Sequence, residues 1–172
     1  SLGIPTIRIN TGRWGTTNPQ GNKSQFDVLM DNKGVESVID GYTEDDGFKW
    51  VIDSIEKCIP TAEKCGVVLG LENHWGLGLT SQGVMRIVNE INSPWLKVTL
   101  DTGNFFDNRE AQLEELAPHT CLIQAKTYFG GAKWPAFNEI NIDYPAIGEL
   151  MRKHNYRGYI SLEFEGNEDA ET

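Results

Sequence analysis

Oxygen-bearing side chains recur at or near the carboxyl ends of four strand-like segments of this chain. They are Glu72, Asp101, Gln124 and Glu163. Three carboxylates brought together repel one another and raise one another's pKa values unless a cation neutralises them. Because the whole set offers oxygen, it suits a hard or borderline ion such as Mg²⁺ or Mn²⁺ better than structural Zn²⁺. The residues therefore predict a divalent metal site, although acidic residues also end strands simply as helix caps.

Two basic side chains follow these positions closely in the sequence. His74 comes two residues after Glu72, and Lys126 comes two residues after Gln124. A lone histidine near a loop is more often a polar surface residue than a ligand. The residues alone favour that simpler interpretation for His74.

Five short segments show the alternation of strands, in which successive side chains point to opposite faces. In the last segment Ile160 and Leu162 share one face, whereas Glu163 lies on the other. Each apolar face is a natural surface for helices to cover, and each opposite face ends in a charged or amide side chain. The segments are Pro5–Asn10, Val67–Asn73, Leu96–Asp101, Cys121–Lys126 and Tyr159–Glu165.

A closed barrel explains this division of the strands better than an open sheet does. A doubly wound sheet carries helices on both faces, so its strands are apolar on both faces. In a βα barrel the helices lie only outside, and the inward face can become polar at the carboxyl rim, where the sites of such barrels lie. The sequence therefore predicts an α/β fold with a parallel barrel and with the four oxygen donors at one mouth.

Four helices are predicted from apolar side chains at helical spacing behind a start signal. Thr43 and Asp46 have the spacing of a capping box, and Pro60 should kink or split the helix that follows them. Alternation of these helices with the strands is typical of parallel βα units. The start signals and apolar stripes are Thr43 with Phe48 to Ala62, Thr80 with Val84 to Ile91, Asp107 with Leu113 and Leu116, and Asp143 with Ile147 to Met151.

Two long connections have no helical or strand periodicity. Thr11 to Tyr42 is rich in Gly, Asn, Asp and Ser, and Tyr128 to Asn138 carries Trp134 and paired glycines. A structureless loop of such length inside a compact domain is uncommon unless it is a lid or a binding loop. Surface insertion without a role is an equal alternative for each connection.

Charge and hydropathy exclude several classes of partner. Fifteen basic against twenty-five acidic residues give a net charge of −10, without any basic run. Nucleic-acid binding is disfavoured because affinity for a phosphate backbone comes mainly from Lys and Arg. No apolar stretch approaches the ~20 residues that span a bilayer, so a membrane partner is not expected.

The three cysteines are odd in number and lack the spacing of a metal finger. Cys58, Cys65 and Cys121 are therefore expected to be free thiols in a reducing compartment, with the cytoplasm as the expected location. The simplest interpretation makes them small buried hydrophobic residues.

Four motifs stand at the ends of the last four predicted strands: Leu71–His74, Leu100–Phe105, Gln124–Thr127 and Ile160–Gly166. Together they resemble the xylose isomerase-like TIM-barrel superfamily, specifically its sugar phosphate isomerase/epimerase branch. The resemblance extends from Ile7 to Glu165 and implies strands four to eight of a (β/α)8 barrel. The first three strands and the last helix would then be absent, so residues 1–172 would be one domain that is a fragment.

The resemblance also implies a ligand set for a divalent ion. In the family a Glu, an Asp, a His and a second Glu hold the metal, and these correspond to Glu72, Asp101, Gln124 and Glu163. Gln124 departs from the usual histidine, although its amide oxygen can still coordinate a hard cation. Mn²⁺ or Mg²⁺ is expected, with Zn²⁺ or Co²⁺ as alternatives.

Residues around the ligands are expected to contact a sugar. The resemblance makes His74 and Lys126 substrate-binding groups, and Asn104 stands where relatives often have a substrate-contacting histidine. Arg8 is placed in the same substrate-binding set, where it would hold a carboxylate or the interior polar network, with the structural role favoured. Trp14 and Trp134 offer faces for a sugar ring or, equally, for core packing.

The implied activity is isomerisation or epimerisation of a keto or aldo sugar through an enediolate, with Glu72 and Glu163 exchanging the proton as general base and acid. A catalytically idle sugar-binding barrel is an alternative. An apurinic-site endonuclease is a weaker one, because three histidines and the negative charge suit neither a multi-zinc cluster nor DNA. The sugar is left open, as is the oligomeric state, with a homo-oligomer as one alternative.

Overall fold

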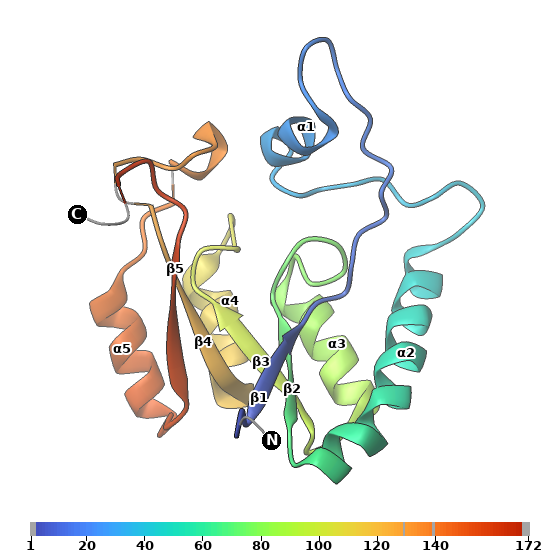
Figure 1. Cartoon of the computed structure of the whole chain (residues 1–172), viewed down its shortest axis with the longest axis vertical. Coiled ribbons are helices and arrows are strands. Elements are labelled where there is room, and N and C mark those ends of the chain that lie inside the picture. The colour runs from blue at the N-terminus through green and yellow to red at the C-terminus, as the bar shows by residue number, and fades with distance from the viewer. Residues whose placement is uncertain (1–2, 129, 139, 170–172) are drawn as a thin grey trace.

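The strands form one parallel sheet whose order in space follows the order in the sequence. The computed structural model describes residues 3–128, 130–138 and 140–169. Figure 1 shows the sheet as a curved arc, which is a partial (β/α)8 barrel. This confirms the predicted fold class and all five predicted strands. The strands are β1 (Thr6–Ile9), β2 (Val68–Glu72), β3 (Leu96–Asp101), β4 (Thr120–Thr127) and β5 (Tyr159–Phe164).

Helices follow the strands and lie outside the arc (Figure 1). All four predicted helices are present, and two short 3₁₀ turns accompany them. They are α2 (Glu44–Cys65), α3 (Ser81–Ile91), α4 (Arg109–Leu116) and α5 (Tyr144–Lys153), with η1 (Ala117–His119) and η2 (Pro135–Phe137).

The helix starts agree with the expected caps in three cases. Thr43 and Asp46 form a reciprocal capping box. The side chains of Thr80 and Asp143 each accept a hydrogen bond from a backbone N–H in the first turn of the helix that follows. The prediction for Asp107 is wrong, because the N-cap of α4 is Asn108, whose backbone is left-handed and whose side chain makes no capping bond. At Pro60 the helix does not split, since α2 continues through it as one helix, and the alternative of a kink there stays a prediction.

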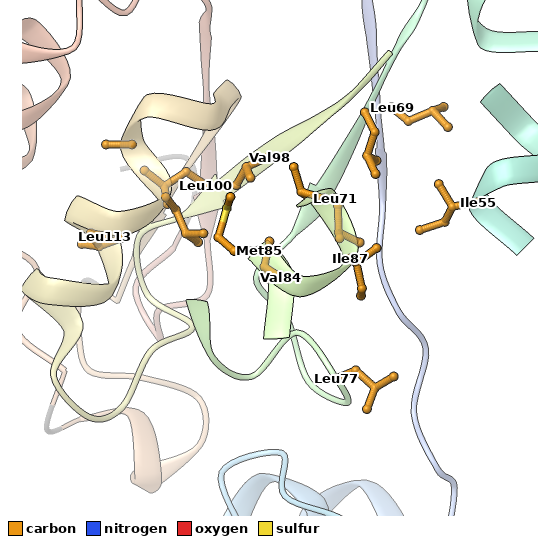
Figure 2. Packing of buried hydrophobic residues seen from close by; sticks show 14 of the residues in the cluster. Ile55, Leu69, Leu71, Leu77, Val84, Met85, Ile87, Val98, Leu100 and Leu113 are labelled. Carbon is orange, nitrogen blue, oxygen red and sulfur yellow. The ribbon is translucent and has the colours of Figure 1, made fainter. Parts of the chain in front are cut away.

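The main hydrophobic core fills the space between the sheet and the helices (Figure 2). Leu71, Val98 and Leu100 point outward from the strands and are completely buried. Val84 and Ile87 of α3 pack in the same cluster and are also completely buried. Burial of this kind stabilises by about 25 cal/mol per Å² of apolar surface. The core therefore fixes β2 and β3, whose opposite faces carry the polar side chains.

The last strand carries an exposed apolar face. Ile160 and Leu162 of β5 are 67% and 73% exposed. Their alternation is the one predicted from the sequence, yet no described element covers this face. The sequence expectation placed no helix after this strand, so the exposed face of β5 does not contradict it.

A further helix, α1 (Gln25–Asp31), lies in the connection that was expected to be irregular. Ser24 and Asp27 form its capping box. Leu29 and Met30 pack against Phe137 of η2 in a second, smaller hydrophobic cluster. Figure 1 shows α1 beyond the carboxyl ends of the strands, so the two long connections meet above that end of the sheet.

The cysteines are free thiols, as expected. Cys58 and Cys65 are exposed on α2, and Cys121 is partly buried. The expectation of three buried residues is therefore wrong, because these α2 positions lie off the face that packs on the sheet. Within the described residues, no helix is long and apolar enough to cross a membrane.

Candidate functional site

Side chains on the inner face of β2, β3, β4 and β5 form a polar site at the carboxyl ends of the strands. Glu72 and Asp101 are completely buried, and Gln124 and Lys126 are nearly so. Parallel register sets Asp101 beside Gln124 and Lys126 beside Glu163. The register thereby brings Asp101 and Glu163, which are 62 positions apart in the chain, to one ammonium.

That ammonium belongs to Lys126. Its Nζ lies 3.3 Å from Asp101 Oδ2, 3.2 Å from Glu163 Oε2 and 3.5 Å from Glu165 Oε2. It also donates to Asn104 Oδ1 at 2.9 Å. Burial alone would lower the pKa of Lys126, but Asp101, Glu163 and Glu165 raise it above its ordinary value. Lys126 therefore remains a cation at the centre of the site.

Glu72 forms a separate ion pair with the first strand. Arg8 Nη1 lies 3.1 Å from Glu72 Oε2 and donates to Oε1 at 3.2 Å. Burial raises the pKa of Glu72 to about 7, against the opposing effects of Arg8 and Lys126. Arg8 thus holds a carboxylate of the interior network, which is one of the two roles expected for it.

Glu163 has the opposite electrostatic balance. Burial would raise the pKa of this carboxyl, but Lys126 and a hydrogen bond donated by Gln124 Nε2 outweigh burial and lower it. Asp101 is more deeply buried, and burial raises its pKa well above the ordinary value in spite of Lys126. The site therefore combines one carboxyl that favours ionisation with two that resist it.

Asn73 is a part of the site that sequence reasoning missed. Its Nδ2 donates to Asp101 O at 2.9 Å, and its Oδ1 accepts from Asp101 N at 2.7 Å. Asn73 O accepts from Asn104 Nδ2 at 3.0 Å. The buried amide thus ties the end of β2 to Asp101 and Asn104. Strand alternation gave no signal for Asn73, because in an alternating strand the residue after Glu72 points away from the site.

Glu165 and Tyr128 were also not assigned to the site. Glu165 lies two residues after Glu163 and therefore on the same face of the strand, so strand alternation could have identified it. Tyr128 shares the parity of Gln124 and Lys126 just beyond β4, and burial raises the pKa of its hydroxyl above the ordinary value. The signal for Tyr128 was weaker, because the strand ends before it.

His74 lies beside this network rather than in it. With Arg13, Phe26 and Trp75 it lines a cavity of about 290 Å³. Burial lowers the pKa of His74 to about 4, and the charges of Lys126 and Arg8 act in the same direction. The imidazole is therefore neutral and packs against Trp75, with ring centroids 4.7 Å apart.

The two tryptophans in the long connections serve packing in the structure. Trp14 packs against the main core, and Trp134 packs against the second cluster with its ring 5.4 Å from that of Phe26. Of the two roles expected for them, packing is therefore observed.

The donor chemistry of the site fits a hard divalent cation. Glu72 Oε2 and Asp101 Oδ2 are buried and accept no hydrogen bond from any described residue, although Arg8 and Lys126 form ion pairs with them. Both are carboxylate oxygens, the kind that Mg²⁺ and Mn²⁺ prefer. Lys126 supplies a competing positive charge, and among the described residues no three His, Cys, Asp or Glu side chains surround one point closely enough to bind an ion.

Residues 2–172 match the family model described as xylose isomerase-like TIM barrel. The chain belongs to this family. Among curated protein sequences, none matches the chain significantly. Solved structures do match, and the three described next do so at identities that establish only the fold.

A 3-keto-D-glucoside 4-epimerase from E. coli is 16% identical, with a TM-score of 0.63 over 98% of this chain and 74% of that one. A D-allulose 3-epimerase from Methylomonas sp., in complex with D-allulose, is 15% identical, with a TM-score of 0.59 over 73% of this chain and 44% of its own. A xylose isomerase-like TIM barrel protein from Mycobacterium smegmatis, in complex with magnesium, is 16% identical, with a TM-score of 0.58 over 75% of this chain and 46% of its own.

The chain thus spans less than half the length of the last two structures. These comparisons confirm the family expected from the four motifs.

Proposed function

We propose that the protein is a divalent-metal-dependent sugar isomerase or epimerase that moves a proton next to a carbonyl through an enediolate. The observation that carries this proposal is the pair of completely buried carboxyls, Glu72 and Asp101, at one end of the sheet. Each has one oxygen that accepts no hydrogen bond from a described residue and faces only the charge of Arg8 or Lys126. Several structural relatives are sugar epimerases by name, which is consistent with that chemistry.

Glu72, Asp101, Gln124 and Glu163 would hold the ion, with Gln124 contributing its amide oxygen. When bound, a divalent cation stabilises the negative charge that develops on neighbouring carbonyl and hydroxyl oxygens of a sugar. Mn²⁺ or Mg²⁺ fits the oxygen donors best.

Glu163 and Glu72 are the groups that would transfer the proton, because they are carboxyls on strands at opposite sides of Lys126. Proton transfer by a positioned side chain contributes typically ~10² to 10⁴-fold to a rate. Arg8 fixes the orientation of Glu72 through its ion pair. Glu72 is completely buried and therefore shielded from water, whereas the side chain of Glu163 is 28% exposed, so Glu163 can exchange its proton with solvent.

The remaining residues would position the substrate. Lys126 would orient a substrate hydroxyl with its ammonium, and Asn104 holds that ammonium in place. His74, as a neutral imidazole in the adjoining cavity, would contact a more distant part of the sugar.

Solvent deuterium exchange tests this proposal. The protein with Mn²⁺ or Mg²⁺ should incorporate deuterium next to the carbonyl of at least one ketose in a panel containing D-allulose, D-tagatose and L-ribulose. Glu163→Gln should reduce the rate by ~10² or more. Glu114→Gln is the matched control, because Glu114 pairs with Lys153 on the surface.

Equal exchange by Glu163→Gln and the wild type would contradict the role of Glu163. Saturable ketose binding without exchange would instead support the idle sugar-binding barrel. Neither binding nor exchange across the panel would contradict the proposed function.

A further inference from the structure

The hydroxyl of Tyr128 is buried and has no hydrogen-bond partner among the described residues. Buried tyrosine hydroxyls usually find a partner, because an unpaired polar group loses its interactions with water without compensation. Tyr128 follows Gln124 and Lys126 at the spacing of inward-facing residues, just past the end of β4. Its orphaned hydroxyl therefore belongs to the same end of the sheet as the polar site.

Glycine at position 103 makes room for this hydroxyl. A Cβ added at Gly103 would lie 3.0 Å from Tyr128 Oη and 2.9 Å from Lys126 Cδ. Both distances are shorter than side-chain atoms normally tolerate. Tyr128 Oη and the stem of Lys126 therefore both lie against the backbone of Gly103, where a side chain at position 103 would collide with them.

The ring of Tyr128 is fixed by packing against other aromatic side chains. It packs against the second hydrophobic cluster, and its centroid lies 5.9 Å from that of Phe137. The aromatic contact fixes the ring without using the hydroxyl. The oxygen is thus positioned by packing but is free to interact with an additional partner.

We propose that the Tyr128 hydroxyl donates a hydrogen bond to an oxygen of the substrate held beside Lys126, which makes Tyr128 a substrate-contacting residue. This inference rests on the proposed function and identifies the bound group as a hydroxyl or carbonyl oxygen of a sugar. It accounts for an O–H that is buried, fixed and unpaired.

Tyr128→Phe tests the proposal, because it removes only the oxygen. Tyr156→Phe is the matched control, since its hydroxyl donates to the backbone of Tyr159 at the other end of β5. In deuterium exchange by the metal-loaded protein, Tyr128→Phe should raise KM for the active ketose by roughly 2- to 15-fold, as for the loss of one neutral hydrogen bond. Tyr156→Phe should leave KM unchanged.

Thermal unfolding without sugar separates substrate contact from a structural role. Since the hydroxyl bonds to no described residue, Tyr128→Phe should leave the melting temperature unchanged or raise it. An unchanged KM would overturn the inference, whether or not the melting temperature falls. Exchange by the wild type is measured before any variant is made. If the wild type exchanges no ketose of the panel, that result contradicts the proposed function, whereas an unchanged KM in Tyr128→Phe contradicts only the role of Tyr128.

Discussion

Lys126 is the residue on which the electrostatics of the site depend. Its buried ammonium contacts Asp101, Glu163 and Glu165, so it offsets negative charge that the sheet places in a region of low exposure. A buried charge without its partner is far more costly than an intact pair. The lysine therefore allows several acidic side chains to share one end of the strands.

Replacing Lys126 with methionine should destabilise the protein in a pH-dependent manner. Lys126→Met keeps the length of the side chain but leaves Asp101 and Glu163 uncompensated, which should cost about 3–5 kcal/mol of the free energy of unfolding at pH 7.5. The loss should be smaller at pH 5, because carboxyls with raised pKa values bind protons in the folded state and then need no cation. Urea unfolding of both proteins at the two pH values measures this difference.

A loss of equal size at both pH values would show that the lysine contributes only by packing. Added Mn²⁺ should restore part of the stability of the variant if a cation is what the site lacks.

The three thiols should differ in reactivity. Cys58 and Cys65 are exposed, whereas Cys121 is partly buried and donates to Val98 O. Burial raises the pKa of Cys121 to about 11, so little of its reactive thiolate is present at pH 8. Labelling with a thiol reagent at pH 8 should modify the two helix cysteines quickly and Cys121 only after unfolding. Rapid modification of all three would contradict the packing around β4.

At the level of single residues, strand alternation predicted which side chains lie at the carboxyl ends of β2 to β5. It also placed Lys126 on the same face as Gln124, but it could not predict that the ammonium would contact Asp101, Glu163 and Glu165, because those contacts depend on the length and bending of the side chain. It also missed Asn73, whose contacts are made to the backbone of a neighbouring strand. Such contacts follow from three-dimensional register rather than from local spacing.

The two long connections act together as a structural element. Helix α1 and turn η2 share the second hydrophobic cluster, which is separate from the main core. Segments with few contacts to the main core open at a lower free energy than the core itself. We therefore expect this part of the molecule to open without unfolding of the sheet.

Phe137→Ala should make this local opening of α1 and η2 more frequent. Phe137 is 2% exposed and packs against Phe106, Tyr128 and Trp134. Its truncation should accelerate tryptic cleavage at Lys23 and Lys33 several-fold, because α1 loses its support. Leu100→Ala in the main core is the comparison and should instead lower the free energy of unfolding by about 2–5 kcal/mol. Unchanged cleavage in Phe137→Ala would show that α1 is held by other contacts.

The elements of the barrel were predictable because the main helices and the strands have distinct periodicities. Helix α1 was missed for a physical reason. Its buried residues Val28, Leu29 and Met30 are consecutive, since they contact neighbours on several sides of a short helix. A pattern search for one apolar stripe cannot detect such an element.

At the scale of the whole molecule, the curvature of the sheet converts four strand ends into one site. Residues from β2 to β5 reach a common region only because parallel strands carry their carboxyl ends to the same side. The covered outer faces of β2 and β3 supply the packing that holds this geometry, while the outer face of β5 is exposed. Position in the family fold, rather than local sequence, therefore explains why these residues meet.

A titration with Mn²⁺ tests this account most directly. The wild type should bind one equivalent of Mn²⁺, and Asp101→Asn should weaken that binding by about tenfold or more, because it removes a buried ligand charge. Glu114→Gln should bind as the wild type does. Absence of saturable binding by the wild type, or equal affinity of Asp101→Asn, would contradict the proposal that the carboxyl ends of β2 to β5 form a metal site.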